Sequence, residues 1–193
     1  MKKFWTNLKM FLWLTVLTGI IYPLVVTGLA HLTMKNRAEG DFISVDGKIV
    51  GATLIAQKFE GDKYFWGRPS AVDYNPLPSG GSNLGPTSAI LKKAVADRKA
   101  QLIKAHSINE KDTIPSELLF ASGSGLDPHL TPAAVHFQLD RVIKARGWDE
   151  KRKEEILKII NHLTESRRLG FLGEPHVNVL KLNLSLDELD KQK

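Results

Sequence analysis

The N-terminal region contains the feature that most constrains this chain. Between Met10 and Thr33 no residue carries a permanent charge. At about 1.5 Å of rise per residue, a helix over this stretch is long enough to cross a hydrocarbon core of about 30 Å. Pro23 falls within it, which lipid tolerates when neighbouring helices satisfy the freed carbonyl. We therefore predict a single transmembrane helix that has helical partners.

The charges on either side of this span predict its orientation. Lysines precede the span without any acid, whereas bases and acids cancel after it. These residues are Lys2, Lys3 and Lys9 before the span, and Lys35, Arg37, Glu39 and Asp41 after it. The excess of positive charge marks the cytoplasmic side. We expect residues 1–33 to form a basic cytoplasmic tail and the transmembrane helix, and residues 34–193 to form an extracytoplasmic domain.

A cleaved signal peptide is the alternative reading of the same segment. Gly28-Leu29-Ala30 resembles a cleavage site with small residues at its ends. The apolar core of a signal peptide usually has only about 7–15 residues, however. The longer span, interrupted by Pro23, favours a permanent anchor in membrane lipid.

The net charge and the absence of cysteine exclude several functions. The chain carries a formal charge of +6, and half of it comes from the three lysines before the span. The remaining charge is spread over residues 34–193, which is not the concentrated patch that a phosphate backbone requires. We expect no nucleic-acid binding. With no cysteine, disulfides, thiol catalysis and cysteine-based metal sites are excluded.

The patterns after residue 41 predict an α+β domain. Residues 42–66 look like β structure, with an Asp46-Gly47 turn that is typical of a hairpin. Residues 177–186 alternate between leucine and mostly polar residues, which predicts a strand with one buried face. Between these regions we expect a long loop over about residues 67–86, and such loops are usually functional or ordered by a partner.

Three helices are expected between these strands. The first runs from about Pro86 to His106, with Ile90, Leu91, Ala94, Val95 and Leu102 on its buried side. The second has Thr131 as its N-cap and Gly147 at its end, and it would bury Val135, Leu139, Val142 and Ile143. The third is capped by Asp149, with Ile156, Ile159, Ile160 and Leu163 at helical spacing.

The most suggestive loop is the run of small residues from Ser79 to Thr87. Such residues before a helix can present backbone N–H groups to an anion. The Lys-Ser/Thr pair of a phosphate-binding P-loop is missing, as is the G-x-G-x-x-G spacing of a dinucleotide fold. A structural turn or a partner-binding loop is the favoured reading.

A second polar run extends from Ala121 to His129. A hydrolase would use Ser124 as nucleophile, His129 as base and Asp127 to orient it. The G-x-S-x-G elbow is absent because Ser122 takes the place of the first glycine. Triad members also normally come from distant segments. A tight turn is favoured, and a membrane-anchored extracytoplasmic serine hydrolase stays as the alternative.

The histidines and Arg68 give no metal or cofactor signal. The six histidines show no H-E-x-x-H or comparable ligand spacing. Arg68 follows three aromatic residues and precedes Pro69, where stacking or local pairing is the ordinary expectation. We predict no metal site, no directly bound cofactor and no catalytic residue.

Several long motifs, taken together, resemble one known family. They are Tyr64-Phe65-Trp66-Gly67-Arg68-Pro69-Ser70-Ala71, Tyr74-Asn75, the 79–87 and 121–129 runs, Arg141-Val142, Ala145-Arg146-Gly147, Val177-Asn178-Val179-Leu180 and Leu182-Asn183-Leu184. In this order they resemble the C subunit (KdpC) of the bacterial Kdp potassium-transporting P-type ATPase, over nearly the whole chain.

The resemblance implies a non-catalytic accessory subunit in a bacterial inner membrane. Its partners would be a channel-like potassium-binding subunit, an ATP-hydrolysing P-type subunit and a small membrane peptide. It also implies a catalytic chaperone that supports ATP binding by the pump subunit, with ATP reaching the complex only through that subunit. The D-K-T-G motif of P-type pumps is absent from this chain.

We predict that the two polar runs contact these partners. The charge-poor hydroxyls, amides and glycine backbones of these runs can hydrogen-bond a partner loop. The candidate contact residues are Arg68, Ser79, Gly80, Gly81, Ser82, Asn83, Ser122, Ser124, Asp127 and His129.

Overall fold

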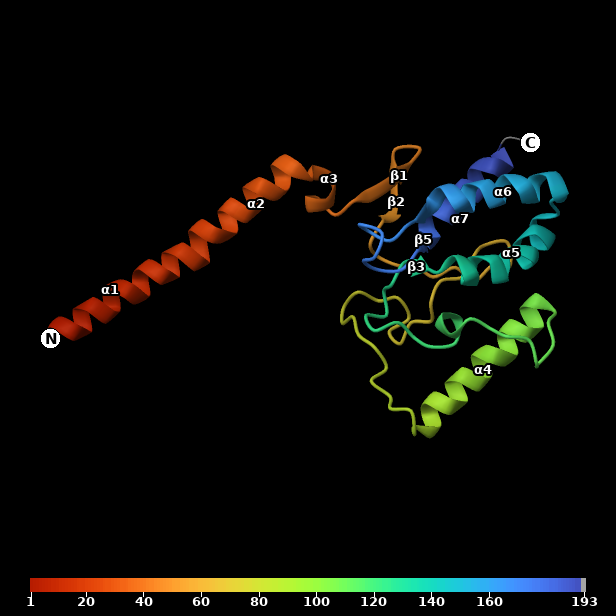
Figure 1. The fold of residues 1–193 in the computed structure, drawn as a ribbon, viewed down its shortest axis with the longest axis horizontal. Coiled ribbons are helices and arrows are strands. Elements are labelled where there is room, and N and C mark those ends of the chain that lie inside the picture. The colour runs from red at the N-terminus through yellow and green to blue at the C-terminus, as the bar shows by residue number, and fades with distance from the viewer. Residues whose placement is uncertain (192–193) are drawn as a thin grey trace. The chain divides into compact units, whose positions relative to one another are not determined.

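A computed structural model describes residues 1–191, which fall into two compact units. The first unit is Met1–Ala52, and the second begins at Thr53. Figure 1 shows the helices and strands of both. The boundary proposed from the sequence, between residues 33 and 34, separates the membrane segment from the extracytoplasmic domain. That boundary stays a prediction.

The first unit begins with a long helix. α1 (Lys2–Val16) continues through one π-helical turn at Leu17–Ile21 into α2 (Tyr22–Thr33), and none of these residues is buried. The wider turn lies just before Pro23, whose ring would clash with the carbonyl four residues earlier in a regular helix. By length and composition, Lys2–Thr33 is able to cross a membrane.

Four threonine hydroxyls of this helix are satisfied within it. Thr6, Thr15, Thr18 and Thr33 each donate to the carbonyl four residues earlier, at 2.7–3.0 Å. A hydroxyl without a partner is costly in hydrocarbon. These four threonines can therefore face hydrocarbon with their hydroxyls paired.

The predicted hairpin is confirmed. After a short helix α3 (Lys35–Ala38), β1 (Phe42–Val45) pairs antiparallel with β2 (Lys48–Ala52). Asp46 and Gly47 both have positive φ, at 51° and 76°, as a tight two-residue hairpin turn requires. The prediction of β structure was wrong beyond Ala52, because residues 53–66 are turns and extended loop.

The second unit confirms the three predicted helices. These are α4 (Ala89–His106), α5 (Pro132–Arg146) and α6 (Glu150–Leu163). Thr131 and Asp149 cap α5 and α6 with their side chains, and Gly147 ends α5 in a left-handed conformation. Short strands β3 (His129–Leu130), β5 (His176–Asn178) and β4 (Thr164–Glu165) form an antiparallel sheet in that order.

The predicted strand over residues 177–186 was wrong after Asn178. Helix α7 (Val179–Lys191) follows β5 directly and lies beside α6 (Figure 1). Its buried residues are Val179, Leu180, Leu182, Asn183 and Leu186. The spacing 179, 182, 183 and 186 is that of one helical face, and leucine is a strong helix former without a branched β-carbon.

The core lies among α5, α6, α7 and the sheet, with Phe65 inserted from the loop. Val135, Leu139, Val142, Ile156 and Ile160 are buried as expected, whereas Ile143, Ile159 and Leu163 are only partly buried. On α4, Leu102 is buried, but Ile90 is 70% exposed, contrary to the prediction. The other three predicted residues, Leu91, Ala94 and Val95, are half-buried.

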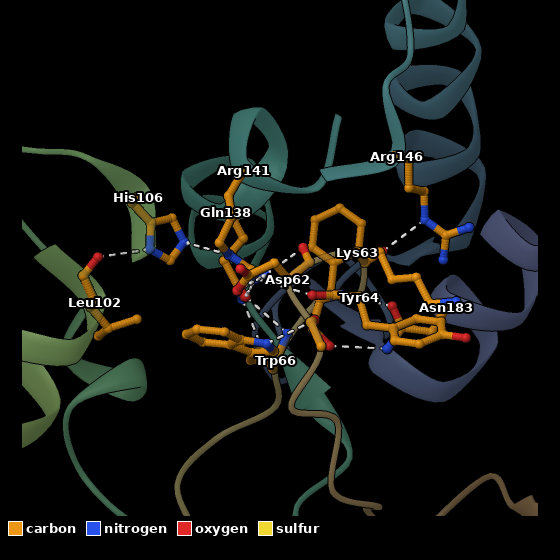
Figure 2. A network of polar contacts seen from close by, with 12 residues as sticks. Asp62, Lys63, Tyr64, Trp66, Leu102, His106, Gln138, Arg141, Arg146 and Asn183 are labelled. Carbon is orange, nitrogen blue, oxygen red and sulfur yellow. Dashed lines mark hydrogen bonds and ion pairs between the residues drawn. The ribbon is translucent and has the colours of Figure 1, made fainter. Parts of the chain in front are cut away.

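Two side-chain amides fix the chain at Phe65 and Trp66 (Figure 2). Asn183 of α7 accepts from the Phe65 N–H and donates to its carbonyl, both at 2.9 Å. Gln138 of α5 does the same for Trp66, at 2.8 and 3.0 Å. We call these four bonds the amide clamp. They give the buried backbone of this loop the partners that a neighbouring strand would otherwise supply.

Replacing Asn183 with alanine should destabilise the second unit markedly. The substitution leaves the N–H and C=O of the fully buried Phe65 without partners, at a cost of about 2–4 kcal/mol. Urea unfolding of the full chain in detergent, followed by tryptophan fluorescence, measures this. Asn161→Ala, on the exposed side of α6, should stay within about 0.5 kcal/mol. Equal unfolding midpoints for the two variants would contradict the role of the clamp.

Candidate functional site

The two polar runs singled out from the sequence meet in the structure. The Gly80 N–H donates to the Ser124 carbonyl at 2.9 Å, and the Ser122 N–H donates to the Pro69 carbonyl at 3.0 Å. We call residues 67–83 together with 121–129 the loop junction. Two segments about 45 residues apart are thus joined mainly through their backbones.

Two glycines permit this close approach. Gly125 has a φ of +71°, and a β-carbon there would lie 2.6 Å from Val72 Cγ2 and 2.8 Å from the Gly80 carbonyl oxygen. A β-carbon on Gly81 would lie 2.9 Å from the Gly123 carbonyl oxygen. Gly123 itself has open space around it. The small residues are therefore needed at positions 81 and 125 by geometry rather than by ligand chemistry.

A charged group closes one side of the junction. Arg68 Nη1 lies 2.9 Å from Asp127 Oδ2, and His129 Nδ1 lies 3.6 Å from Asp127 Oδ1. Burial alone would raise the pKa of Asp127, but the His129 ring and backbone N–H, together with Arg68, hold it at about 2. Asp127 is therefore ionised at any physiological pH and serves as a fixed anchor for Arg68.

The Arg68 guanidinium lies beside a small cavity. Arg68, Ser116, Glu117, Phe120 and Thr131 are among the residues that line this space of about 350 Å³. Its Nε is buried and has no hydrogen-bond partner among residues 1–191. Glu117 accepts from both the N–H and the hydroxyl of Thr131. The cavity thus holds one cation and one carboxylate, a balanced pair rather than an anion site.

Of the other candidate residues, Ser122 is buried, contrary to its predicted role as a partner contact, and Gly80 and Gly81 are half-buried. Ser79, Ser82 and Asn83 are exposed. The glycine-rich run ends at Thr87, directly before Ser88, which caps α4 and accepts from the Leu91 N–H at 3.4 Å. The helix N-terminus is thus occupied by the side chain of Ser88, and the phosphate-binding reading gains no support.

The geometry does not assemble a hydrolase triad. The exposed Ser124 accepts through Oγ from the Leu126 N–H at 3.1 Å. The hydrogen bonds of residues 1–191 include none between Ser124 and His129. Asp127 does face His129, but it is also paired with Arg68. Without a base at the serine, proton removal has no route.

A second polar centre was not expected from the sequence. The buried Arg141 donates to the carbonyls of Asp62 and Tyr64 at 2.6 and 3.0 Å, and to Gln138 Oε1 at 2.8 Å. Its guanidinium also stacks 4.0 Å from the centre of the Trp66 ring. Burial lowers the pKa of Arg141 to about 10, and the negative charge of Asp62 partly offsets this shift. Arg141 therefore stays charged.

His106 completes this centre (Figure 2). Its Nδ1 lies 2.9 Å from the Leu102 carbonyl, and its Nε2 accepts from Arg141 Nε at 3.2 Å. These partners require the neutral ring with its hydrogen on Nδ1. Burial and the charge of Arg141 lower the pKa of His106. The hydrogen bond with Leu102 and the charge of Asp62 act in the opposite direction but do not cancel this shift. The sequence did contain a signal for this polar centre. Gln138 and Arg141 lie on the same face of the predicted helix as Leu139 and Val142, which were expected to be buried.

No metal site is found within residues 1–191. That part of the chain contains no group of three or more His, Asp or Glu side chains placed to hold a metal ion. The structure thus defines a class: an α+β unit with tightly joined polar loops, in a chain that begins with an apolar helix.

Comparison with known proteins identifies the family. A family model described as "K+-transporting ATPase, c chain" (KdpC) matches residues 4–188. The chain is 46% identical over 195 residues to the potassium-transporting ATPase KdpC subunit of Geotalea uraniireducens (strain Rf4), covering 99% of this chain and 100% of the relative. It is 47% identical over 186 residues to the KdpC subunit of Serratia proteamaculans (strain 568), covering 95% and 96%.

A third relative shows a similar level of identity. The KdpC subunit of Leptospira interrogans (serogroup Icterohaemorrhagiae serovar copenhageni, strain Fiocruz L1-130) is 47% identical over 181 residues, or 94% of this chain and 91% of the relative. The chain therefore belongs to the KdpC family of potassium-transporting ATPase subunits, as its motifs predicted.

The neutral His106 predicts a loss of stability in acid. Its pKa is lowered in the folded state, so the unfolded chain binds a proton more readily as the pH falls below the usual value near 6.5. The free energy of unfolding should then fall by up to about 1.4 kcal/mol per pH unit from this group. His106→Gln, which can donate and accept but not titrate, should flatten the decline between about pH 7 and pH 5.

Unfolding free energies of both proteins over this pH range provide the measurement. The comparison rests on the difference in slope, since the other titrating groups are common to both chains. A slope unchanged by His106→Gln would show that the ring is not kept neutral by its partners.

Proposed function

We propose that this chain is a non-catalytic accessory subunit of a high-affinity, ATP-driven potassium uptake complex. The observation that carries the proposal is the long apolar helix, none of whose residues is buried, in a chain matched from end to end by potassium-transporting ATPase subunits. Such a helix needs lipid or other membrane helices around it. The chain would thus contribute to the complex by assembly rather than by chemistry.

The proposed partners follow from the family. They are a channel-like potassium-binding subunit, an ATP-hydrolysing P-type subunit and a small membrane peptide. Gly19 and Gly28 in the long helix have no atoms close to where a β-carbon would be. Small residues of this kind let helices approach closely in lipid. We assign the helix a role in packing against membrane partners as well as in anchoring.

The proposed topology places the N-terminus in the cytoplasm and the second unit outside the bacterial inner membrane. Lys2, Lys3 and Lys9 support this orientation. ATP is then on the other side of the membrane from the loop junction. Support for ATP binding by the pump subunit would be indirect, passing through the helix and its partners, and the chain itself would bind neither ATP nor another cofactor.

The loop junction is the proposed surface for contacts with the partners. It keeps Ser79, Ser82, Asn83 and Ser124 exposed, while its backbone is fixed by hydrogen bonds across the two runs. A surface that is already ordered loses little entropy on binding. The chemistry suits hydrogen bonding to a partner loop rather than storage of a potassium ion, since Asp127 is held by Arg68.

The anchor and its orientation can be tested directly. A reporter fused to the C-terminus should be active only on the extracytoplasmic side, and the mature protein should retain the N-terminal Met-Lys-Lys sequence. Changing Lys2, Lys3 and Lys9 to glutamate should reduce the correctly oriented fraction, because the positive charges set the orientation. A mature chain that begins near His31 would instead identify a signal peptide.

Two glycines of the junction give a matched pair of variants. Gly125→Ala should reduce recovery of the partner subunits and growth at low potassium, because the β-carbon meets Val72 in a left-handed backbone. The expected destabilisation is about 2–5 kcal/mol. Gly123→Ala, two residues earlier with open space around it, should behave nearly as the unchanged chain.

Ser124→Ala separates the proposal from the hydrolase alternative. It removes one exposed hydroxyl and should leave uptake and co-purification from gently solubilised membranes nearly unchanged. If Ser124→Ala abolished uptake while the complex stayed intact, the accessory role would be wrong and nucleophilic catalysis would have to be considered.

A further inference from the structure

The loop between β4 and β5 exposes a cluster of apolar side chains. Leu169 is 81% exposed, Phe171 72% and Leu172 50%. All three come from the sequence Arg167–Gly173, which leaves α6 and β4 and returns into β5 (Figure 1). We call residues 167–173 the apolar tip. Single exposed leucines are common on soluble domains, but three neighbouring apolar residues at one turn mark a contact surface.

The apolar tip is a closed turn. The N–H groups of Arg168 and Leu172 each donate to the carbonyl of the other, at 2.9 Å. Leu169 has a φ of +53° and Gly170 a φ of +81°. Leucine is seldom found in this left-handed region, and here the conformation turns its side chain to solvent instead of into the core. The turn is thus built to present Leu169 and Phe171 outward.

The charge of the apolar tip is positive. Arg167 and Arg168 precede the apolar residues, and Arg167 is paired with Glu174 at 2.7 Å. No ion pair of Arg168 is found within residues 1–191. Arginine beside exposed leucine and phenylalanine is the composition that suits the boundary between acyl chains and anionic headgroups, where the arginine reaches phosphate while the apolar groups enter the lipid.

We propose that the apolar tip inserts into the surface of the bilayer that anchors the chain, with Arg168 contacting an anionic lipid headgroup. This inference rests on the proposed anchoring by the N-terminal helix. A tip of seven residues is small for a stable protein interface. Because the chain is tethered, however, a weak contact with lipid acts at high effective concentration.

The path of the chain supports lipid as the occupant. Thr53, where the second unit begins, receives a hydrogen bond from Asn178 of β5 at 2.7 Å. The strand entered from the apolar tip is therefore the strand that meets the incoming chain. Leu54 and Ile55, the next residues, are also exposed. Only 19 residues lie between Thr33 and Thr53, and the β1–β2 hairpin folds part of that length back on itself.

The absence of cysteine allows a site-specific test. The full chain with Phe171→Cys is labelled with a nitroxide and reconstituted in nanodiscs of phosphatidylethanolamine and phosphatidylglycerol. We expect the ratio of oxygen to nickel-chelate accessibility at position 171 to be several-fold higher than at Ile90→Cys, an exposed apolar position on α4. Arg168→Gln, or discs without phosphatidylglycerol, should lower that ratio.

Two further measurements separate the possible failures. A label at Val16→Cys reports whether the helix lies in lipid, so a lipid-exposed Val16 with an aqueous position 171 would overturn only the inference, whereas an aqueous Val16 would overturn the anchoring as well. The assembled ATPase is labelled in parallel. If position 171 is aqueous in the isolated chain and becomes shielded from both probes only in the complex, the apolar tip docks on a protein and the lipid assignment is wrong.

Discussion

The second unit depends on two side-chain amides that replace a missing strand. Phe65 is completely buried, yet it lies in a loop, so its backbone polar groups need partners that no sheet provides. Asn183 and Gln138 supply them from two different helices. Leaving these buried amide groups unpaired would cost several kcal/mol. The loop, α5 and α7 therefore depend on one another and have to form together.

The arrangement of the polar loops follows from this clamp. Gly67 and Arg68 come directly after Trp66. Holding Trp66 in place therefore also sets the position of the Arg68 backbone. Arg68 then reaches Asp127, and the run from Ser122 to Gly125 closes against Pro69 and Gly80. Arg141 reinforces the same point from α5, since it binds the Tyr64 carbonyl and Gln138 together. The surface proposed for partner contacts is thus supported from the core.

Local signals in the sequence were sufficient for much of this fold. The apolar stretch, the Asp46-Gly47 turn and the caps at Thr131, Asp149 and Gly147 each act over a few residues, and each appears as predicted. The C-terminal region was misjudged because leucines at alternate positions satisfy a strand, while Val179, Leu182 and Leu186 equally satisfy a helix. Residues 53–66 were misjudged because several of their backbone groups pair with side chains more than 70 positions away.

The candidate site shows the same division. Composition alone singled out Arg68, Asp127 and the glycine-rich runs, but nothing local indicates that Arg68 and Asp127 pair across 59 positions. Gln138 and Arg141 were overlooked because polar residues on a helix are ordinarily assigned to the solvent face.

Two charged centres of the second unit respond differently to pH: Asp127 stays ionised, whereas His106 has to be neutral to keep its hydrogen bond with Arg141. Asp127 is held ionised by Arg68 and His129, so this carboxylate keeps its charge over any pH the protein meets. His106, in contrast, accepts from Arg141 and can do so only while neutral. Protonation would place two cations against each other next to Trp66, at the residue that the amide clamp holds. Acid would therefore weaken the contacts that hold Trp66 beneath the loop junction while Asp127 is still ionised and paired with Arg68.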